Sequence, residues 1–298
     1  MKKFIFTTLV IFSLFSSLFS QGKIRRSAIA GSWYPAEPRK LKAFLKGFFD
    51  ENTRVPVKGE IRGIISPHAG YFYSGNAAAA VYKQIEGRNY DIVVIIAPSH
   101  HEAFRGSSIY PGDAYETPFG KVYIDKDIAK KIVETGKTVK FSEKGHLYMG
   151  IPREHSLEIQ LPLLQMVIKK FKIIPIIMGE QNLKNCKDLA DAIARSIKGK
   201  KFLIVASSDL SHYHNYNEAL KLDGALLSAF EKFDYIKIMK NIESRKWEAC
   251  GGGPIVTAMI TCERFGAKRA QVIKYYNSGD LKGSGKSSVV GYAGGIIF

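Results

Sequence analysis

Short apolar runs alternate with longer amphipathic stretches along most of the chain. The runs are rich in valine and isoleucine without polar alternation, which is typical of strands covered on both faces. They predict strands over residues 61–66, 91–97, 172–178, 201–207, 270–276 and 287–298. The stretches between them carry apolar residues at helical spacing and predict helices over residues 38–50, 75–85, 127–134, 156–171, 183–197, 217–230 and 251–265. This alternation predicts a single α/β/α sandwich.

The first twenty residues differ from the rest of the chain. Lys2 and Lys3 form a short positive region, an apolar run follows over residues 4–19, and small residues precede Gln21. This is the layout of a secretory signal peptide, and it predicts cleavage after Ser20 and export to the periplasm or beyond the cell. The alternative is an uncleaved anchor, because the run approaches the roughly 18 residues that begin to indicate a spanning helix. We expect residues 21–298 to form one domain, with no stable membrane insertion after cleavage.

Charge and cysteine content narrow the function only in part. The formal net charge is +17, which favours acidic partners. The lysines are dispersed through predicted amphipathic helices, as at Lys40, Lys42 and Lys46, and no nucleic-acid motif accompanies them, so nucleic acid is not an expected partner. Three cysteines are an odd number for an exported chain and exclude a disulfide scaffold. Cys186 and Cys262 lie in helical apolar patterns, which predicts core packing.

Metal-capable residues follow several predicted strands. His68 follows the first core strand and His100 the second, while Asp209 and His212 follow the strand over residues 201–207. Ligand sites in open α/β sheets form beyond the carboxyl ends of the strands, so these side chains are expected to converge there. A single histidine after a strand is more often a hydrogen-bonded loop residue, but the repetition favours a shared site.

Cys250 stands immediately before a helix opened by three glycines. Cysteine is usually a small buried residue, but a helix N-terminus stabilises a thiolate, and this favours a ligand role. Imidazole and thiolate are good ligands for iron, copper or zinc. Ser156 could cap the next helix and leave His155 facing the same crevice, although a cap with an incidental histidine explains the segment equally well.

Six segments together carry a family resemblance. They are residues 30–35 (AGSWYP), 67–71 (PHAGY), 98–101 (PSHH), 154–158 (EHSLE), 207–212 (SSDLSH) and 250–251 (CG). In this order, over essentially the whole mature chain, they resemble the MEMO family, also called AmmeMemoRadiSam system protein B. The resemblance implies a fold like that of the class III extradiol dioxygenases, which are non-haem iron enzymes with two histidine ligands and a carboxylate ligand.

The resemblance also implies roles for individual residues. His68 and His100 match the two histidine ligands, Cys250 stands in place of the carboxylate, and His212 matches the acid/base histidine, with Asp209 beside it. We expect one transition metal ion per chain, Fe(II) or Cu in preference to Zn, because a thiolate ligand is soft. The family name refers to a radical-SAM enzyme partner, but an export signal argues against such a cytosolic partnership.

Three functions remain open at the level of sequence. The first is a dioxygenase-like oxidoreductase, in which His212, Asp209 and His155 are the candidate catalytic residues. The second is a copper- or iron-binding protein without turnover. The third is a peptide- or protein-binding module that uses the former active-site crevice. The substrate, whether a small molecule or a peptide, is not indicated by any motif.

Overall fold

The computed structural model describes residues 22–298. Its strands are β1 (Ile24–Arg25), β2 (Gly63–Ser66), β3 (Ile92–Pro98), β4 (Ser107–Ile109), β5 (Ala114–Thr117), β6 (Gly120–Tyr123), β7 (Val139–Phe141), β8 (Leu147–Tyr148), β9 (Ile151–Pro152), β10 (Lys172–Met178), β11 (Phe202–Ser207), β12 (His212–His214), β13 (Ala270–Asn277) and β14 (Val289–Ile297). The helices are α1 (Pro38–Asp50), α2 (Tyr71–Lys83), α3 (Lys126–Thr135), α4 (Gln160–Val167), α5 (Leu183–Ser196), α6 (Tyr216–Glu231), α7 (Tyr235–Glu243) and α8 (Gly252–Glu263). The predicted signal peptide lies outside the described residues.

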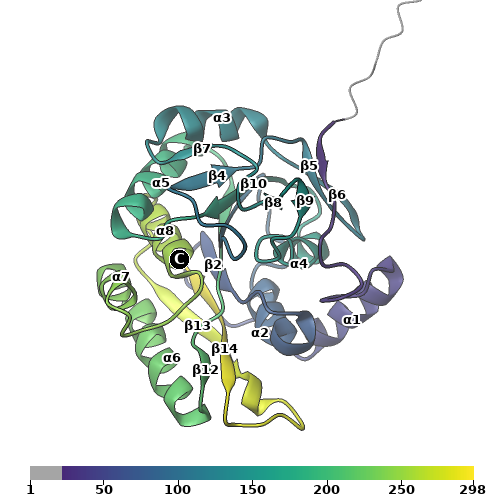
Figure 1. Ribbon diagram of the computed structural model, residues 1–298, viewed down its shortest axis with the longest axis vertical. Helices are drawn as coiled ribbons and strands as arrows, with labels where there is room; N and C mark the ends of the chain where they lie inside the picture. The colour runs from purple at the N-terminus through teal and green to yellow at the C-terminus, as the bar shows by residue number, and fades with distance from the viewer. Residues whose placement is uncertain (1–21) are drawn as a thin grey trace, which may run out of the picture.

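The centre of the structure is a mixed sheet of nine strands within residues 22–298. Its strand order is β12-β14-β2-β11-β3-β10-β4-β7, with β13 paired to β14. The four central strands β2, β11, β3 and β10 run parallel, while β14 and β4 flank them antiparallel. Helices α5, α6, α7 and α8 lie along one side of the sheet and α1, α2 and α4 along the other (Figure 1). The predicted α/β sandwich is therefore confirmed.

The central strands form the core because they are apolar on both faces. Every residue of β3 is buried, and Ile92 at its start pairs with Lys172 of β10 on one side and Phe202 of β11 on the other. Burial of each valine or isoleucine side chain contributes roughly 1.5–3 kcal/mol relative to exposure. Helix α2 packs closely on β14, since a Cβ at Gly294 would lie 2.6 Å from the carbonyl oxygen of Ala77.

The structure has short strands that the sequence pattern does not predict, namely β1, β4 to β9 and β12, and it differs from the predicted helices in three places. Helix α2 begins at Tyr71 rather than residue 75, because Gly70 ends the preceding turn and the helix tolerates Gly75 inside it. Helix α4 covers only Gln160–Val167, with turns over residues 156–159, so Pro162 falls in its first turn, where a missing N–H is tolerated. Helix α7 lies outside the predicted helices, because it is only nine residues long and follows α6 after three residues, so its apolar positions do not stand out as a separate element.

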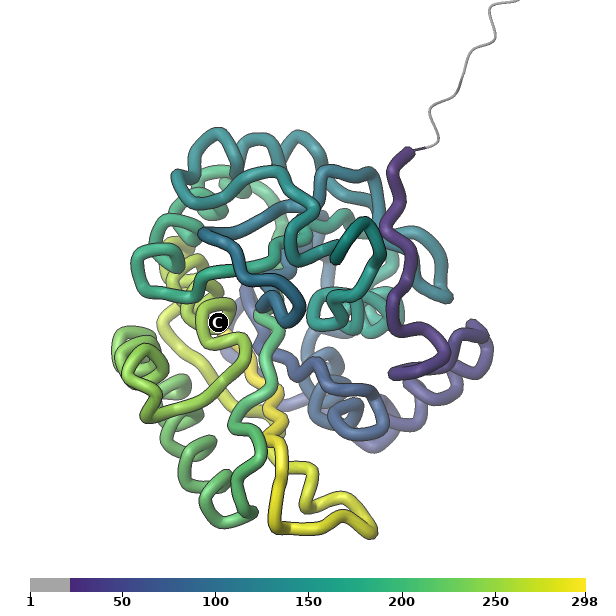
Figure 2. The backbone as a smooth tube through the Cα atoms, in the orientation of Figure 1, coloured from purple at the N-terminus to yellow at the C-terminus, as the bar shows by residue number. Residues whose placement is uncertain are grey.

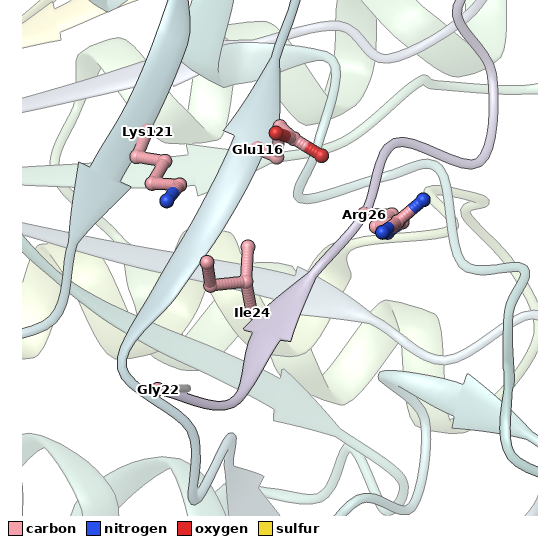
Figure 3. Close-up of a pocket in the computed structure, with 5 residues that line it drawn as sticks. All are labelled: Gly22, Ile24, Arg26, Glu116 and Lys121. Carbon is pink, nitrogen blue, oxygen red and sulfur yellow. The ribbon is translucent and has the colours of Figure 1, made fainter. Parts of the chain in front are cut away.

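A smaller sheet holds the start of the described chain. β1 pairs in parallel with β5, and β5 pairs with β6. Figure 3 shows the pocket of about 690 Å³ on this sheet, which is lined by Gly22, Ile24, Arg26, Glu116 and Lys121. Figure 2 shows the N-terminal segment running down one side of the molecule beside the segments that precede α4. None of the helices within residues 22–298 is both long and apolar enough to cross a membrane.

Candidate metal centre

Three neighbouring strands deliver one polar side chain each to the same edge of the sheet. His68, His100 and Asp209 each stand two residues beyond the last residue of β2, β3 and β11. Because β11 lies between β2 and β3, the three turns are adjacent in space. The rings of His68 and His100 meet edge to face with their centroids 5.0 Å apart. Of the residues expected to converge, His68, His100 and Asp209 therefore lie together at the carboxyl edge of the sheet.

His155 joins these two histidines from the segment between β9 and α4. One ligand nitrogen from each of His68, His100 and His155 lies within 4.8 Å of the other two, a spacing that a single metal ion could bridge. The His155 ring stacks on His100, with centroids 4.5 Å apart, and lies beneath Trp33, with centroids 4.3 Å apart. The sequence predicts His155 as an acid/base candidate, and its place beside the other two histidines would also allow it to bind a metal ion.

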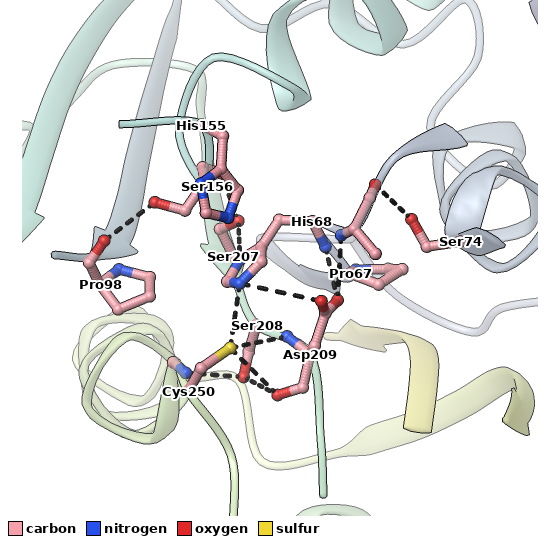
Figure 4. Close-up of polar contacts among 12 residues, drawn as sticks. Pro67, His68, Ser74, Pro98, His155, Ser156, Ser207, Ser208, Asp209 and Cys250 are labelled. Atoms are coloured by element: carbon pink, nitrogen blue, oxygen red, sulfur yellow. Dashed lines mark hydrogen bonds and ion pairs between the residues drawn. The ribbon is translucent and has the colours of Figure 1, made fainter. Parts of the chain in front are cut away.

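Hydrogen bonds fix the tautomer of His68. The Ser207 hydroxyl donates to the carbonyl of Ser156 at 2.6 Å, so it must accept from His68 Nδ1 at 2.9 Å and from Gln160 Nε2 at 2.8 Å. His68 therefore carries its proton on Nδ1, and Nε2 presents a lone pair. That lone pair faces Cys250, whose Sγ lies 3.0 Å from Nε2 (Figure 4).

Glu154 fixes the orientation of the His100 ring. Its buried carboxylate accepts the Nδ1–H of His100 at 2.9 Å and the backbone N–H of His100 at 2.7 Å. The same carboxylate accepts the backbone N–H groups of His155 and Ser156, both at 3.1 Å. His100 Nε2 is thus left free. A carboxylate behind a histidine that presents its other nitrogen is the arrangement found around metal-binding histidines.

The protonation states suit a metal ion. Burial lowers the pKa of His68 well below its ordinary value and lowers the pKa of His155 to about 3. Both imidazoles are consequently neutral near pH 7, which is the form that binds metal. The donor set, three imidazoles with a thiol beside them, fits a transition metal ion.

Cys250 departs from one expectation. It stands two residues before α8, and its Sγ accepts the backbone N–H of Asp209 at 3.2 Å. Burial, followed by the negative charge of Asp209, raises the pKa of the Cys250 thiol well above its ordinary value, so the helix N-terminus does not by itself produce a thiolate. Only a positive charge placed beside Cys250, such as that of a metal ion, would favour loss of the proton.

Asp209 and His212 complete the set of predicted residues. Asp209 Oδ1 accepts the backbone N–H groups of His68 at 2.7 Å and Ala69 at 3.3 Å, while Oδ2 points into the site, 4.0 Å from His68 Nε2. Burial raises the pKa of the Asp209 carboxyl. His212 begins β12 and donates its Nδ1–H to the carbonyl of Leu210 at 2.8 Å, which leaves its Nε2 free.

The sequence does not predict that the N-terminal strap, residues 24–34, holds the segment carrying Glu154 and His155. Arg25 and Glu158 are both fully buried and form an ion pair at 2.7 Å. Arg25 also donates to the carbonyl of Glu154 at 2.6 Å, and Glu158 accepts from the backbone of Ala28 at 2.8 Å and the hydroxyl of Tyr34 at 2.8 Å. No local signal in the sequence pairs residues 133 positions apart.

The fold is that of a mixed α/β protein, and its three convergent histidines could hold a metal ion. A family model described as "Memo-like protein" matches residues 25–296, and the chain belongs to this family. A MEMO1 family protein of Nitrosopumilus maritimus is 36% identical over 280 residues, which is 92% of this chain and 99% of the relative. One from Saccharolobus islandicus strain L.S.2.15 is 36% identical over 283 residues, 90% of this chain and 97% of the relative. The resemblance seen in the motifs is confirmed.

Proposed function

We propose that this Memo-like protein holds one Fe(II) or Cu ion through His68, His100 and Cys250 and uses it as a dioxygenase-like oxidoreductase on a small molecule. The observation that carries the proposal is the meeting of three imidazoles, two of them with Nδ1 held by hydrogen bonds and Nε2 presented to the centre. A bound ion of this kind supplies one-electron redox chemistry and an open coordination position.

The surrounding residues have distinct tasks in this proposal. Asp209 ties down the turn that carries His68, and its second oxygen faces the site. His212, with Nε2 free, is the group that accepts or returns a proton at the substrate; such a residue contributes about 10²–10⁴-fold to a rate. His155, neutral down to low pH, is either a further ligand or a second proton acceptor.

Metal content decides the first part of the proposal. Protein from its native compartment, purified without chelator or nickel, should carry about one iron or copper per chain by elemental mass spectrometry. His68→Ala and Cys250→Ser should lose the metal, because each removes a ligand atom. Loss of metal in His155→Ala would make His155 a further ligand, and retention would make it a second proton acceptor. The matched control is His101→Ala, which removes an exposed histidine and should retain the metal. Full retention of metal in Cys250→Ser would overturn the ligand set.

A binding function without turnover is the second candidate. Large aromatic side chains next to the site residues are exposed, with Phe72 70%, Tyr73 47% and Tyr213 78% accessible. Such a rim suits a peptide ligand, since exposed aromatic residues are enriched where proteins recognise partners. Oxygen consumption by the metal-loaded protein distinguishes the enzyme from the binding protein. If no oxygen is consumed with any reductant or phenolic substrate, metal binding without turnover is favoured. Peptide affinity that survives Cys250→Ser favours the binding module.

We also propose export, on the basis of residues 1–20. Mass spectrometry of the protein recovered from cells should give a chain that begins at Gln21. An intact N-terminus together with recovery in the cytosol would refute export and would restore a radical-SAM partner as a candidate.

A further inference from the structure

A second candidate site lies at the opposite edge of the sheet. Two short basic segments, residues 169–172 (KKFK) and 198–201 (KGKK), stand far apart in the sequence and precede β10 and β11. Both strands pair with the start of β3, so Asp91 is flanked on both sides: its backbone N–H donates to the carbonyl of Lys201, and its carbonyl accepts from the N–H of Lys172. With adjacent strands about 4.8 Å apart, the two segments are roughly 10 Å from each other.

A cleft of about 740 Å³ opens between these segments. Its cations are Lys170, Lys172, Lys200 and Lys201, and its carboxylates are Asp91 and Asp125; Asn89, Tyr90, Ile92, Tyr123 and Phe171 complete the lining. This volume falls within the range of small-molecule sites.

The cleft carries more positive than negative charge. Lys172 forms an ion pair with Asp125 at 3.5 Å, and the Asp125 carboxylate also caps α3 by accepting the N–H of Ile128. Among the described residues, Lys170, Lys200 and Lys201 have no carboxylate within 4.0 Å, although all three are exposed. Like charges gathered at this spacing repel one another unless an anion lies between them.

The walls add contact surface for an organic ligand. Tyr123 is 56% exposed and Phe171 is half-buried, so both present aromatic surface. The Tyr90 hydroxyl donates a hydrogen bond to the carbonyl of Ile61 at 2.9 Å, so only the Tyr90 ring is available to a ligand. Recognition here rests on ammonium groups, which bind phosphate oxygens as compact point charges.

This cleft is remote from the metal centre. β3 runs for seven residues between Ile92 at the cleft and Pro98 beside the histidine turns, and at about 3.3 Å per residue the two edges lie roughly 20 Å apart. We propose that the cleft is a separate binding site for a phosphate-bearing ligand, either a soluble phosphate compound or the headgroup of an anionic phospholipid. The proposal is independent of the function of the metal centre.

The test compares two variants with the same change in net charge. Lys200→Glu/Lys201→Glu reverses two charges in the cleft, and Lys40→Glu/Lys42→Glu reverses two exposed charges on α1. Each protein, as it is recovered from cells, is titrated with inorganic pyrophosphate and with vesicles of phosphatidylglycerol or of phosphatidylcholine, at low and at physiological salt.

We expect the cleft variant to bind at least tenfold more weakly and the α1 variant to stay within twofold of the unmodified protein. Binding of pyrophosphate identifies a soluble ligand, and binding of phosphatidylglycerol vesicles alone identifies a headgroup. Equal loss in both variants, or no binding by the unmodified protein, overturns the proposal. Tighter binding of a short single-stranded oligonucleotide than of either probe, with the same dependence on the cleft, would also overturn it.

Discussion

The polar side chains at the two edges of the central sheet differ in burial and in hydrogen bonding. At the carboxyl edge His68, Asp209 and Glu154 are buried, and nearly every polar atom that they carry has a partner at hydrogen-bond distance. At the amino edge Lys170 and Lys200 extend into solvent without carboxylate partners among the described residues. Both edges are built from the ends of the same strands, β3 and β11.

The difference teaches what burial contributes to a site. Buried groups have shifted pKa values and fixed tautomers, so the carboxyl edge is organised before any ligand arrives. Exposed lysines keep their charge and their freedom, so an anion bound at the amino edge is held by screened electrostatics. Substitutions should therefore change the free energy of unfolding strongly at the first edge, and only slightly and in a salt-dependent way at the second.

The largest effect is expected where the strap supports the carboxyl edge. Glu158→Gln leaves Arg25 as a buried cation without its counter-ion, and loss of one partner from a buried pair costs about 3–5 kcal/mol of the free energy of unfolding. Urea denaturation measures this loss. The control is Asp50→Asn, which breaks the exposed pair with Lys46 and should cost less than about 1 kcal/mol. Similar losses in both variants would show that burial of the pair is irrelevant.

The next effect tests the support behind His100. Glu154→Gln keeps the shape of the side chain but removes the charge that holds the His100 ring, and substitutions of this kind typically lower metal affinity by about 10–100-fold. Competition with a chromophoric chelator measures the affinity. Glu218→Gln, on the exposed face of α6, should leave it unchanged. Unaltered affinity in Glu154→Gln would remove His100 from the proposed ligand set.

A pH effect of intermediate size is expected from His146. Burial lowers its pKa to about 3, and its ring bonds to the Tyr115 hydroxyl and the Ser108 carbonyl. Below pH 6.5 this histidine is protonated in the unfolded chain but not in the folded chain. Its contribution to the free energy of unfolding is therefore fully present above pH 6.5 and is lost as the pH falls toward 3. The loss between pH 7.5 and pH 5.5 is about 1.4 kcal/mol from this residue.

Urea denaturation at the two pH values, with His146→Gln beside the unmodified protein, isolates the contribution of His146. Both proteins share the other buried histidines, so the difference between their pH slopes belongs to His146. Identical slopes would mean that His146 is protonated in the folded protein or that its site opens to water.

The smallest effect is expected at the amino edge. Lys200→Ala removes one of several mutually repelling charges and should change the free energy of unfolding by no more than about 0.5 kcal/mol, with a slight gain at low salt. Denaturation at two salt concentrations measures it. A loss above 2 kcal/mol would mean that Lys200 has a structural partner and would weaken the contrast between the two edges.

Much of the metal centre could be predicted because it depends on strand ends. His68, His100 and Asp209 follow apolar runs that the sequence displays, and parallel strands bring their carboxyl ends together. The Glu154–Glu158 segment was harder to place. Its turns precede α4, and the course of the segment is set by the pairing of Arg25 with Glu158, which no periodicity reveals.

The basic cleft was missed for a related reason. The lysines of residues 169–172 and 198–201 look dispersed along the chain, and only the strand order places them on either side of Asp91. Sequence pattern indicates which residues end a strand. It does not reveal which strands are neighbours.

The position of β14 bears on how the molecule is made. Strand β14, Val289–Ile297, lies between β2 and β12 and also pairs with β13. Its pairing with β2, as at Gly295 and Ile65, joins segments that are far apart in the sequence. Contacts of such long sequence separation form slowly. We therefore expect the sheet to be completed late in folding, because until β14 docks the edge of β2 is unpaired and open to association with other chains.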